Sequence, residues 1–257
     1  MPLTNFIDEA WRVVDYSKDQ GLTLRVLGAL AFRIHCSQWT PLHVALGREI
    51  TDIDFIANGE HRKDVIELLK GLGYVMNRDQ LRLMRLYRRY MLDDPDNDRH
   101  IDVFFDKLDY CHTIELKQRL EIDYPTISLG DLMLEKLQIV ELNEKDVIDV
   151  IVLLREHEVG DDDEETVNSE YISEILAIDW GFYYTATTNL KKIREYLLNH
   201  KTMKNIDKKI VETKINRLCE HIEETPKSKK WRMRATVGTK RKWYKDVYGG
   251  DISTKRV

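Results

Sequence analysis

The stretch Arg48-Glu-Ile-Thr-Asp52-Ile-Asp54-Phe decides the fold of this chain. Asp52 and Asp54 are two residues apart among isoleucine and phenylalanine residues, so a β-strand here projects both carboxylates from one face. Two neighbouring anions repel each other, and a divalent cation between them removes that repulsion. Mg²⁺ prefers hard oxygen ligands and is usually held by one or two carboxylates together with substrate phosphates. The pattern therefore predicts an acidic strand that binds metal.

A short apolar strand precedes this stretch at residues 24–27 and ends at Gly28-Ala29. An apolar helix is predicted directly afterwards, over residues 30–36. A glycine between a strand and a helix lets the backbone approach a phosphate group at the helix N-terminus. The order of these elements therefore predicts a phosphate-binding turn before the acidic strand.

Two antiparallel strands are predicted at residues 81–92 and 100–105, joined by a turn at 93–97. In the second strand Ile101, Val103 and Phe105 share one face, and Asp102 points to the other. This alternation leaves two interpretations open. Asp102 belongs to a solvated strand face, or it is a third metal ligand.

The chain has a strand, a turn of glycine and a small residue, a helix and then a strand with an Asp-x-Asp pair. This order resembles the nucleotidyltransferase fold of the DNA polymerase β superfamily. The resemblance rests on Leu27-Gly28-Ala29 and Asp52-Ile53-Asp54; Ala29 stands where Gly or Ser is usual, and the gap between the motifs is longer than is common. It implies two Mg²⁺ ions, with Mn²⁺ as an alternative, and a nucleoside triphosphate (NTP) as substrate. The implied metal ligands are Asp52, Asp54 and Asp102, and the implied nucleotide contacts include Gly28, Ala29, Arg48 and Thr51.

A second signal is Leu132-Met-Leu-Glu-Lys136-Leu137, followed by Asn143-Glu-Lys145-Asp146-Val-Ile-Asp149. On composition alone these are two amphipathic helices whose charges face water. Their order resembles the bacterial AbiEii-type toxin nucleotidyltransferases, in which a Lys-Leu helix precedes an (Arg/Lys)-Asp-x-x-Asp helix. By this resemblance Lys136 contacts the nucleotide phosphates and Asp146 stands near the acceptor side.

The chain has 257 residues, of which 33% are charged and 42% hydrophobic, as in ordinary globular proteins. We expect an α/β (α+β) fold: a nucleotidyltransferase domain with a mixed sheet and flanking helices at 1–125, a helical domain at 126–225 and a basic tail at 226–257. A first helix is predicted after an N-cap at Thr4 and runs to about residue 18. Further helices are predicted at 62–72, 128–142, 143–157 and 208–224, with a loop at 37–47 and an acidic loop at 160–165.

The tail carries a charge of +9, which leaves −14 for the rest of the chain. Lys229-Lys230-Trp231-Arg232-Met-Arg234 and Lys240-Arg-Lys-Trp243-Tyr244 alternate cations with aromatic rings. That mixture suits the backbone and stacked bases of RNA. It equally suits a tail that docks on the acidic body of the same protein, so both interpretations stay open.

The resemblance implies transfer of a nucleoside monophosphate to an acceptor hydroxyl, on RNA (tRNA included) or on a small molecule. A non-catalytic relative that binds nucleotide or protein is a further alternative, and an antitoxin is an implied partner. No apolar run reaches the roughly 18 residues of a membrane-spanning helix, and no signal peptide is visible, so we expect a cytoplasmic protein. The sequence has no Walker phosphate loop and no dinucleotide glycine fingerprint.

Overall fold

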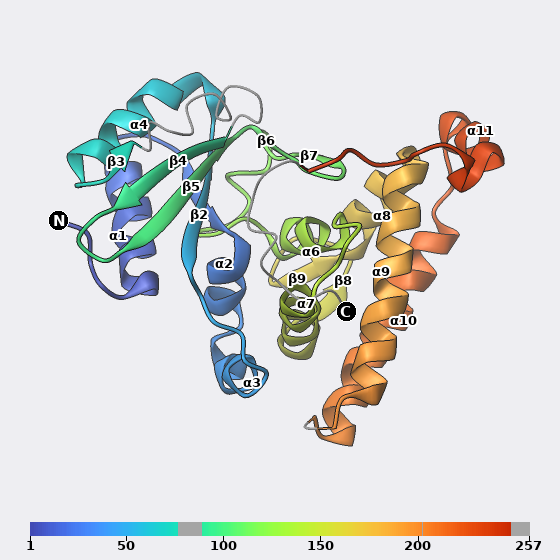
Figure 1. Cartoon of the computed structure of the whole chain (residues 1–257). Helices are drawn as coiled ribbons and strands as arrows, with labels where there is room; N and C mark the ends of the chain where they lie inside the picture. The colour runs from blue at the N-terminus through green and yellow to red at the C-terminus, as the bar shows by residue number, and fades with distance from the viewer. Residues whose placement is uncertain (77–88, 202, 248–257) are drawn as a thin grey trace. The chain divides into compact units, whose positions relative to one another are not determined.

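A computed structural model describes residues 1–76, 89–201 and 203–247 (Figure 1). They form two compact units. The first comprises Met1–Ser37, Glu49–Asp109 and Ile114–Ser128, and the second comprises Gln38–Arg48, Tyr110–Thr113 and the described residues from 129 onward. The first unit contains a mixed sheet and the second is largely helical, so the predicted fold class is confirmed. Within the described ranges, no helix is both long and apolar enough to cross a membrane.

The sheet of the first unit has the strand order β1-β2-β5-β4-β3 in its described part (Figure 1). Strand β1 (Leu24–Leu27) runs antiparallel to β2 (Asp52–Ala57), and β2 runs parallel to β5 (Arg99–Phe105). Strand β4 (Arg89–Asp94) pairs antiparallel with β5 and with β3 (Val75–Met76). The acidic strand β2 is therefore flanked by the glycine-ended strand β1 and by the strand that carries Asp102.

The central strands β2 and β5 are buried on the face that carries their aliphatic residues. Ile53 and Phe55 of β2, and Ile101 and Val103 of β5, are fully buried, which explains why both strands read as apolar runs. On the opposite face of β5, Asp102 is only 3% exposed. The interpretation of Asp102 as part of a solvated strand face is therefore wrong.

Helices α1 (Phe6–Asp19) and α2 (Gly28–His35) pack against strands β1 and β2. Helix α4 (Arg62–Gly71), preceded by a 3₁₀ turn at Gly59–His61, packs against α1. Helix α1 begins one residue later than predicted, because Asn5 caps it by accepting hydrogen bonds from the backbone of Ile7 and Asp8. Helix α2 begins at Gly28 itself, two residues before the predicted start, so the turn glycine is also the first helical residue.

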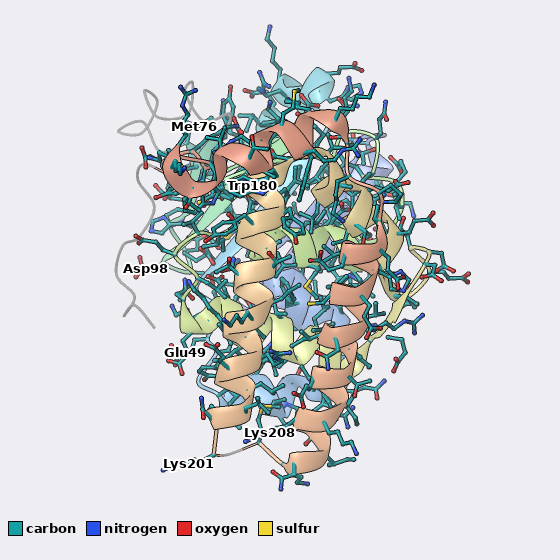
Figure 2. All side chains as sticks on the ribbon, turned by 90° about the vertical axis from the view of Figure 1, so that its right-hand side faces the viewer. Glu49, Met76, Asp98, Trp180, Lys201 and Lys208 are labelled. Carbon is teal, nitrogen blue, oxygen red and sulfur yellow. The ribbon has the colours of Figure 1, made fainter. Side chains whose placement is uncertain are left out.

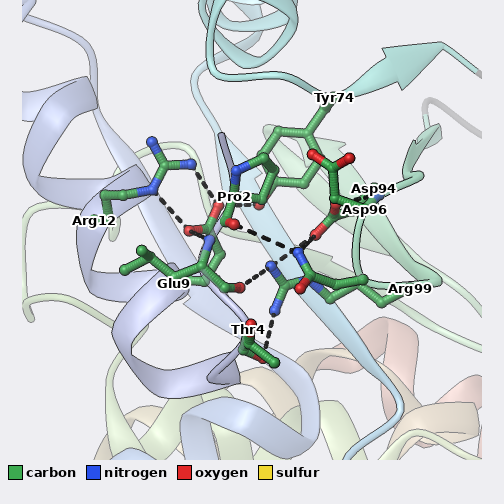
Figure 3. A network of polar contacts seen from close by, with 10 residues as sticks. Pro2, Thr4, Glu9, Arg12, Tyr74, Asp94, Asp96 and Arg99 are labelled. Carbon is green, nitrogen blue, oxygen red and sulfur yellow. Dashed lines mark hydrogen bonds and ion pairs between the residues drawn. The ribbon is translucent and has the colours of Figure 1, made fainter.

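A buried polar network ties the N-terminal residues to the start of β5 (Figure 3). The Glu9 carboxylate accepts hydrogen bonds from the Arg12 guanidinium, the Leu3 backbone N–H and the Tyr74 hydroxyl. Burial would raise the pKa of Glu9, but these hydrogen bonds outweigh it and lower the pKa. Arg99, the first residue of β5, pairs with Asp94 at 2.7 Å and donates to backbone carbonyls of residues 3 and 4. The network thus anchors the strand that carries Asp102.

One predicted loop is helical, and one predicted strand is described only in part. Residues 37–47 were predicted to form a loop, but they form a 3₁₀ turn (Ser37–Trp39) and helix α3 (Thr40–Ala45). Pro41 stands in the first turn of α3, where its missing N–H and fixed φ are tolerated, so it starts a helix here rather than breaking one. The strand predicted at 81–92 is observed from residue 89; residues 81–88 lie outside the described part of the chain.

The second unit contains helices α6 (Leu129–Leu137), α7 (Glu144–Glu156), α8 (Ser169–Ile178), α9 (Trp180–Asn199), α10 (Asn205–Glu224) and α11 (Lys229–Val237), followed by a 3₁₀ turn at Gly238–Lys240. Two short strands, β8 (Glu158–Gly160) and β9 (Thr166–Asn168), flank the predicted acidic loop and pair in parallel. Strands β6 (Lys107–Asp109) and β7 (Thr113–Glu115), most of whose residues belong to the first unit, form another two-stranded sheet.

Helix α6 ends at Leu137, five residues earlier than predicted. The side-chain amide of Asn189 on α9 donates to the carbonyl of Leu137 at 3.1 Å and to that of Ile139 at 2.6 Å. Terminal helix carbonyls need such partners, and Asn189 supplies them from a helix about fifty residues away. Hydrophobic periodicity along residues 128–142 carries no information about that contact, so the predicted end was wrong.

Helices α9 and α10 run side by side, with Trp180 at one end of α9 and Lys201 and Lys208 near the turn at the other end (Figure 2). Leu190, Leu197, Val211 and Leu218 are fully buried along these helices. Burial of these side chains favours the antiparallel pair through the removal of apolar surface from water.

Candidate functional site

Three carboxylates lie on one face of the sheet in the first unit. Asp54 on β2 is the register partner of Asp102 on β5, and residues opposite each other on paired strands project from the same face. Asp52, two residues before Asp54 on the same strand, shares that face. The structure therefore brings together the three predicted metal ligands. Asp52 and Asp54 are half-buried and Asp102 is buried.

Asp102 is only half satisfied. Its Oδ2 accepts a hydrogen bond from Nη2 of Arg89 on β4, and among the described residues its buried Oδ1 has no hydrogen-bond partner. Burial raises the pKa of Asp102; Arg89 opposes this shift and the nearby charge of Asp52 adds to it. A buried carboxylate oxygen without a partner is costly unless a ligand completes it.

Gly28 makes room for this acidic face. Its φ of +69° lies in the left-handed region, which residues with a Cβ rarely adopt. A Cβ built on Gly28 would lie 2.3 Å from Oδ2 of Asp54. The glycine is thus required both by the turn into α2 and by the Asp54 carboxylate that packs against it. Proximity to Asp54 was not part of the sequence prediction, which considered only a phosphate.

The donor set suits a hard divalent cation. Carboxylate oxygens are the ligands that Mg²⁺ and Mn²⁺ prefer, and the partnerless Oδ1 of Asp102 is such a donor. In the arrangement shown by the described residues, no three His, Cys, Asp or Glu side chains form a group arranged to hold a metal ion. Arg89 pairs with Oδ2 of Asp102, so only Oδ1 of this carboxylate is open to a cation while the ion pair is intact.

A second charged cluster lies within the second unit, around Lys136. The Lys136 ammonium is 3.3 Å from Asp146, 3.3 Å from Asp149 and 3.5 Å from Glu135. Burial alone would lower the pKa of Lys136, but these carboxylates outweigh it and raise the pKa. Lys136 and Asp146 are 6% exposed and Asp149 is fully buried, so the interpretation that these charges face water is wrong.

Other predicted residues complete this second cluster. Arg48 donates through Nε and Nη2 to the two oxygens of Asp149, at 2.9 and 3.1 Å, which is the bidentate geometry of a strong ion pair. His43 on α3 approaches the same carboxylate at 3.7 Å. Asp146 also caps α7, because Asn143 and Asp146 form a reciprocal capping box. Within the described residues, both cations of the cluster are therefore neutralised by carboxylates.

The remaining predicted contacts are less constrained. Thr51 is exposed, and its hydroxyl is 3.4 Å from Oδ1 of Asp52. Ala29 is half-buried in the first turn of α2. Sequence reasoning did not assign Arg89, His43 or Asp149 to a site. The spacing of Asp146 and Asp149 could have identified Asp149, since residues three apart share a helix face; nothing in the sequence singled out Arg89.

Comparisons with known proteins leave the family open. No family model matches the chain, and no curated protein matches it. Among solved structures, the chain is similar to the solution structure of the antibiotic-resistance factor ANT(2'')-Ia, with 10% sequence identity and a TM-score of 0.36 over 90% of this chain and 92% of that one. A TM-score at this level is too low to establish a common fold, so the functional assignment rests on the residues themselves.

Proposed function

We propose that this chain is a metal-dependent nucleotidyltransferase, which transfers a nucleoside monophosphate from an NTP to an acceptor hydroxyl. The observation that carries the proposal is the register of β2 with β5, which aligns Asp54 with Asp102 beside Asp52, behind the Gly28 turn. Three carboxylates on one sheet face repel each other, and a divalent cation with a triphosphate would relieve that repulsion.

In this proposal Asp52, Asp54 and Asp102 hold Mg²⁺. When bound, the metal supplies charge neutralisation for the triphosphate and for the leaving pyrophosphate. Asp102 is also the candidate acceptor of the proton from the attacking hydroxyl. The backbone N–H groups at the start of α2, at Gly28 and Ala29, are candidate phosphate contacts, with Thr51 beside them in the chain.

The roles proposed for Lys136 and Asp146 follow from the AbiEii resemblance alone, and that of Arg48 follows from the resemblance to the DNA polymerase β superfamily. A cation that contacts phosphate must exchange one of its carboxylate partners for a phosphate oxygen, and Lys136 has three such partners. A toxin role with an antitoxin partner rests on the same resemblance and stays a prediction.

A small-molecule acceptor is the second candidate, and the tail favours it. Trp243 donates its ring N–H to Thr185 at 3.1 Å and packs edge-on against Tyr184, while Trp231 packs edge-on against Tyr183. Of the two interpretations left open for these rings, packing within the same protein is the one observed for Trp231 and Trp243. The cations around them, including Lys229, Lys230 and Arg232, are exposed and remain free to approach a polyanion.

The proposal is tested by incubating the protein with each α-labelled NTP and Mg²⁺, in the presence of either total cellular RNA or a deproteinised small-molecule extract. Wild type should transfer label to one acceptor pool, and Asp54→Asn should reduce transfer at least about a hundredfold while keeping its melting temperature, because metal ions supply several kcal/mol of transition-state stabilisation. Undiminished transfer by Asp54→Asn, or no product with any NTP, contradicts the proposal.

The acceptor class is tested on the tail. Replacing Lys229, Lys230 and Arg232 by Gln keeps the docked tryptophans and removes only exposed charge, whereas deletion of residues 227–257 removes both. If RNA binds here, the triple variant should lose affinity and its log affinity should fall less steeply with log salt, because fewer counterions are released. RNA binding that is unchanged in the triple variant, together with a lower melting temperature of the truncated protein, identifies the tail as a structural strap.

A further inference from the structure

Arg89 occupies a particular place beside the acidic face. It opens β4, where Met91 is the register partner of Asp102 and Arg89 is the partner of Phe104. Arg89 is therefore a diagonal neighbour of Asp102 on the same face, within reach of a long side chain. Its guanidinium donates to Asp102 and lies 5.8 Å from the centre of the Phe104 ring. The Arg89 side chain is 22% exposed, against 4% for Asp102.

The charges around this ion pair define what the arginine does. Asp52, Asp54 and Asp102 contribute three negative charges, and Arg89 neutralises one of them at the most buried carboxylate. A divalent cation that approaches this face meets a fixed positive charge on one of its ligands. The guanidinium has the planar, forked set of donors that matches a phosphate as well as a carboxylate. Because Arg89 is partly exposed, it can exchange one anion for the other.

We propose that Arg89 is the exchangeable counterion of Asp102, an inference that rests on the proposed function. The guanidinium holds Oδ2 of Asp102 in the absence of nucleotide and would exchange it for the phosphate oxygens of a bound triphosphate. Both oxygens of Asp102 would then be available as metal ligands. Arg89 is thus the positioning residue that would couple metal binding to nucleotide binding.

Metal binding without nucleotide provides the first test, measured by titration calorimetry with Mn²⁺ on the full chain. Arg89→Gln should bind Mn²⁺ about tenfold more tightly than wild type, because a nearby like charge is removed. Arg62→Gln is the matched control. Arg62 lies on α4 over the rings of Tyr90 and Phe105, at 6.0 and 4.9 Å, so its loss changes the net charge equally without removing a partner of Asp102. This control should bind Mn²⁺ as wild type does.

Nucleotide binding provides the second test, with the α,β-methylene analogue of each NTP and saturating Mg²⁺. Arg89→Gln should bind the analogue at least about tenfold more weakly, the effect of one lost hydrogen bond to a charged group. Arg89→Lys keeps the charge but not the forked donors. It should therefore leave Mn²⁺ binding at the wild-type level and weaken analogue binding by less than Arg89→Gln does.

These outcomes distinguish a failure of the proposed function from a failure of the role proposed for Arg89. If Asp54→Asn binds Mn²⁺ as wild type does, the acidic face is not a metal site and the proposed function fails. If Asp54→Asn loses Mn²⁺ but Arg89→Gln binds it no more tightly than Arg62→Gln, only the role of Arg89 is overturned. Should Arg89→Gln fail to fold, Arg89→Lys replaces it: analogue binding must be weaker in Arg89→Lys than in Arg62→Gln, and equal affinities overturn the inference.

Discussion

The two charged clusters of this protein differ in how completely they are satisfied. Around Lys136, two cations face three carboxylates, and each cation is held at close range by partners on α6 or α7. On the sheet face, Arg89 pairs with Asp102, whose Oδ1 has no partner among the described residues. A buried cluster in which each cation is closely paired is complete without a ligand, whereas a buried carboxylate oxygen without a partner can be completed by a cation.

The largest effect on stability is expected from removing the central cation of the Lys136 cluster. Lys136→Met leaves Asp146 and Asp149 buried without their shared cation, and it should lower the free energy of unfolding by about 3–5 kcal/mol, as measured by urea denaturation. Lys145→Met serves as the control. Lys145 lies on α7 next to Asp146 and is only half-buried, so its replacement should change the free energy of unfolding by less than about 1 kcal/mol. A Lys136→Met protein of wild-type stability with weakened NTP binding would instead identify Lys136 as a phosphate ligand.

A third buried group, His112, makes the stability of the second unit depend on pH. His112 is 4% exposed, shares a hydrogen bond with Thr185 at 2.9 Å and stacks on Phe182. Burial lowers its pKa from 6.5 to about 4, with Lys245 adding to the shift and Asp179 opposing it.

Between these two pH values the unfolded chain binds the proton and the folded protein does not, so stability falls as pH drops from 6.5 towards 4. The loss should approach about 3 kcal/mol, and His112→Gln should remove that part of the pH dependence. His61→Gln, which replaces an exposed histidine, should keep it. Equal slopes for His112→Gln and wild type in denaturation curves from pH 4 to 7 would contradict the buried, neutral state of His112.

The glycine next to the acidic face tests how tightly that face is packed. Gly28→Ala places a methyl group against Asp54 in a left-handed backbone and should cost about 2 kcal/mol or more of unfolding free energy. Gly21→Ala is the matched control, because Gly21 has a similar φ of +71° and no atom near its Cβ position. It should cost only about 1 kcal/mol, the backbone strain. Equal losses in thermal denaturation would show that Asp54 moves aside freely.

The smallest effect on stability is expected from a substitution on the acidic sheet face itself. Asp52→Asn removes one of three like charges and should change the free energy of unfolding by less than about 1 kcal/mol, towards greater stability. Transfer activity should fall sharply in the same protein. A clear loss of stability in urea denaturation would mean that Asp52 is a structural residue, and the contrast between the two clusters would disappear.

Much of the fold follows from local sequence. The strand at β2, the helix after Gly28 and the cap at Asn143 were correct to within two residues, because alternation, glycine and capping side chains act on neighbours along the chain. Local signals failed where the deciding partner is distant. The end of α6 depends on Asn189, and the segment at 37–47 becomes a helix that packs with α7 and carries His43 towards Asp149.

The same division holds for the candidate site. Sequence alone determined that Asp52 and Asp54 share a strand face, since the two-residue period of a β-strand is a local property. Only the tertiary structure decided that Asp102 aligns with Asp54, that Asp102 is buried, and that Arg89 is its partner. Register between strands about fifty residues apart is set by packing and hydrogen bonding across the sheet, and neither leaves a mark in the local pattern of residues.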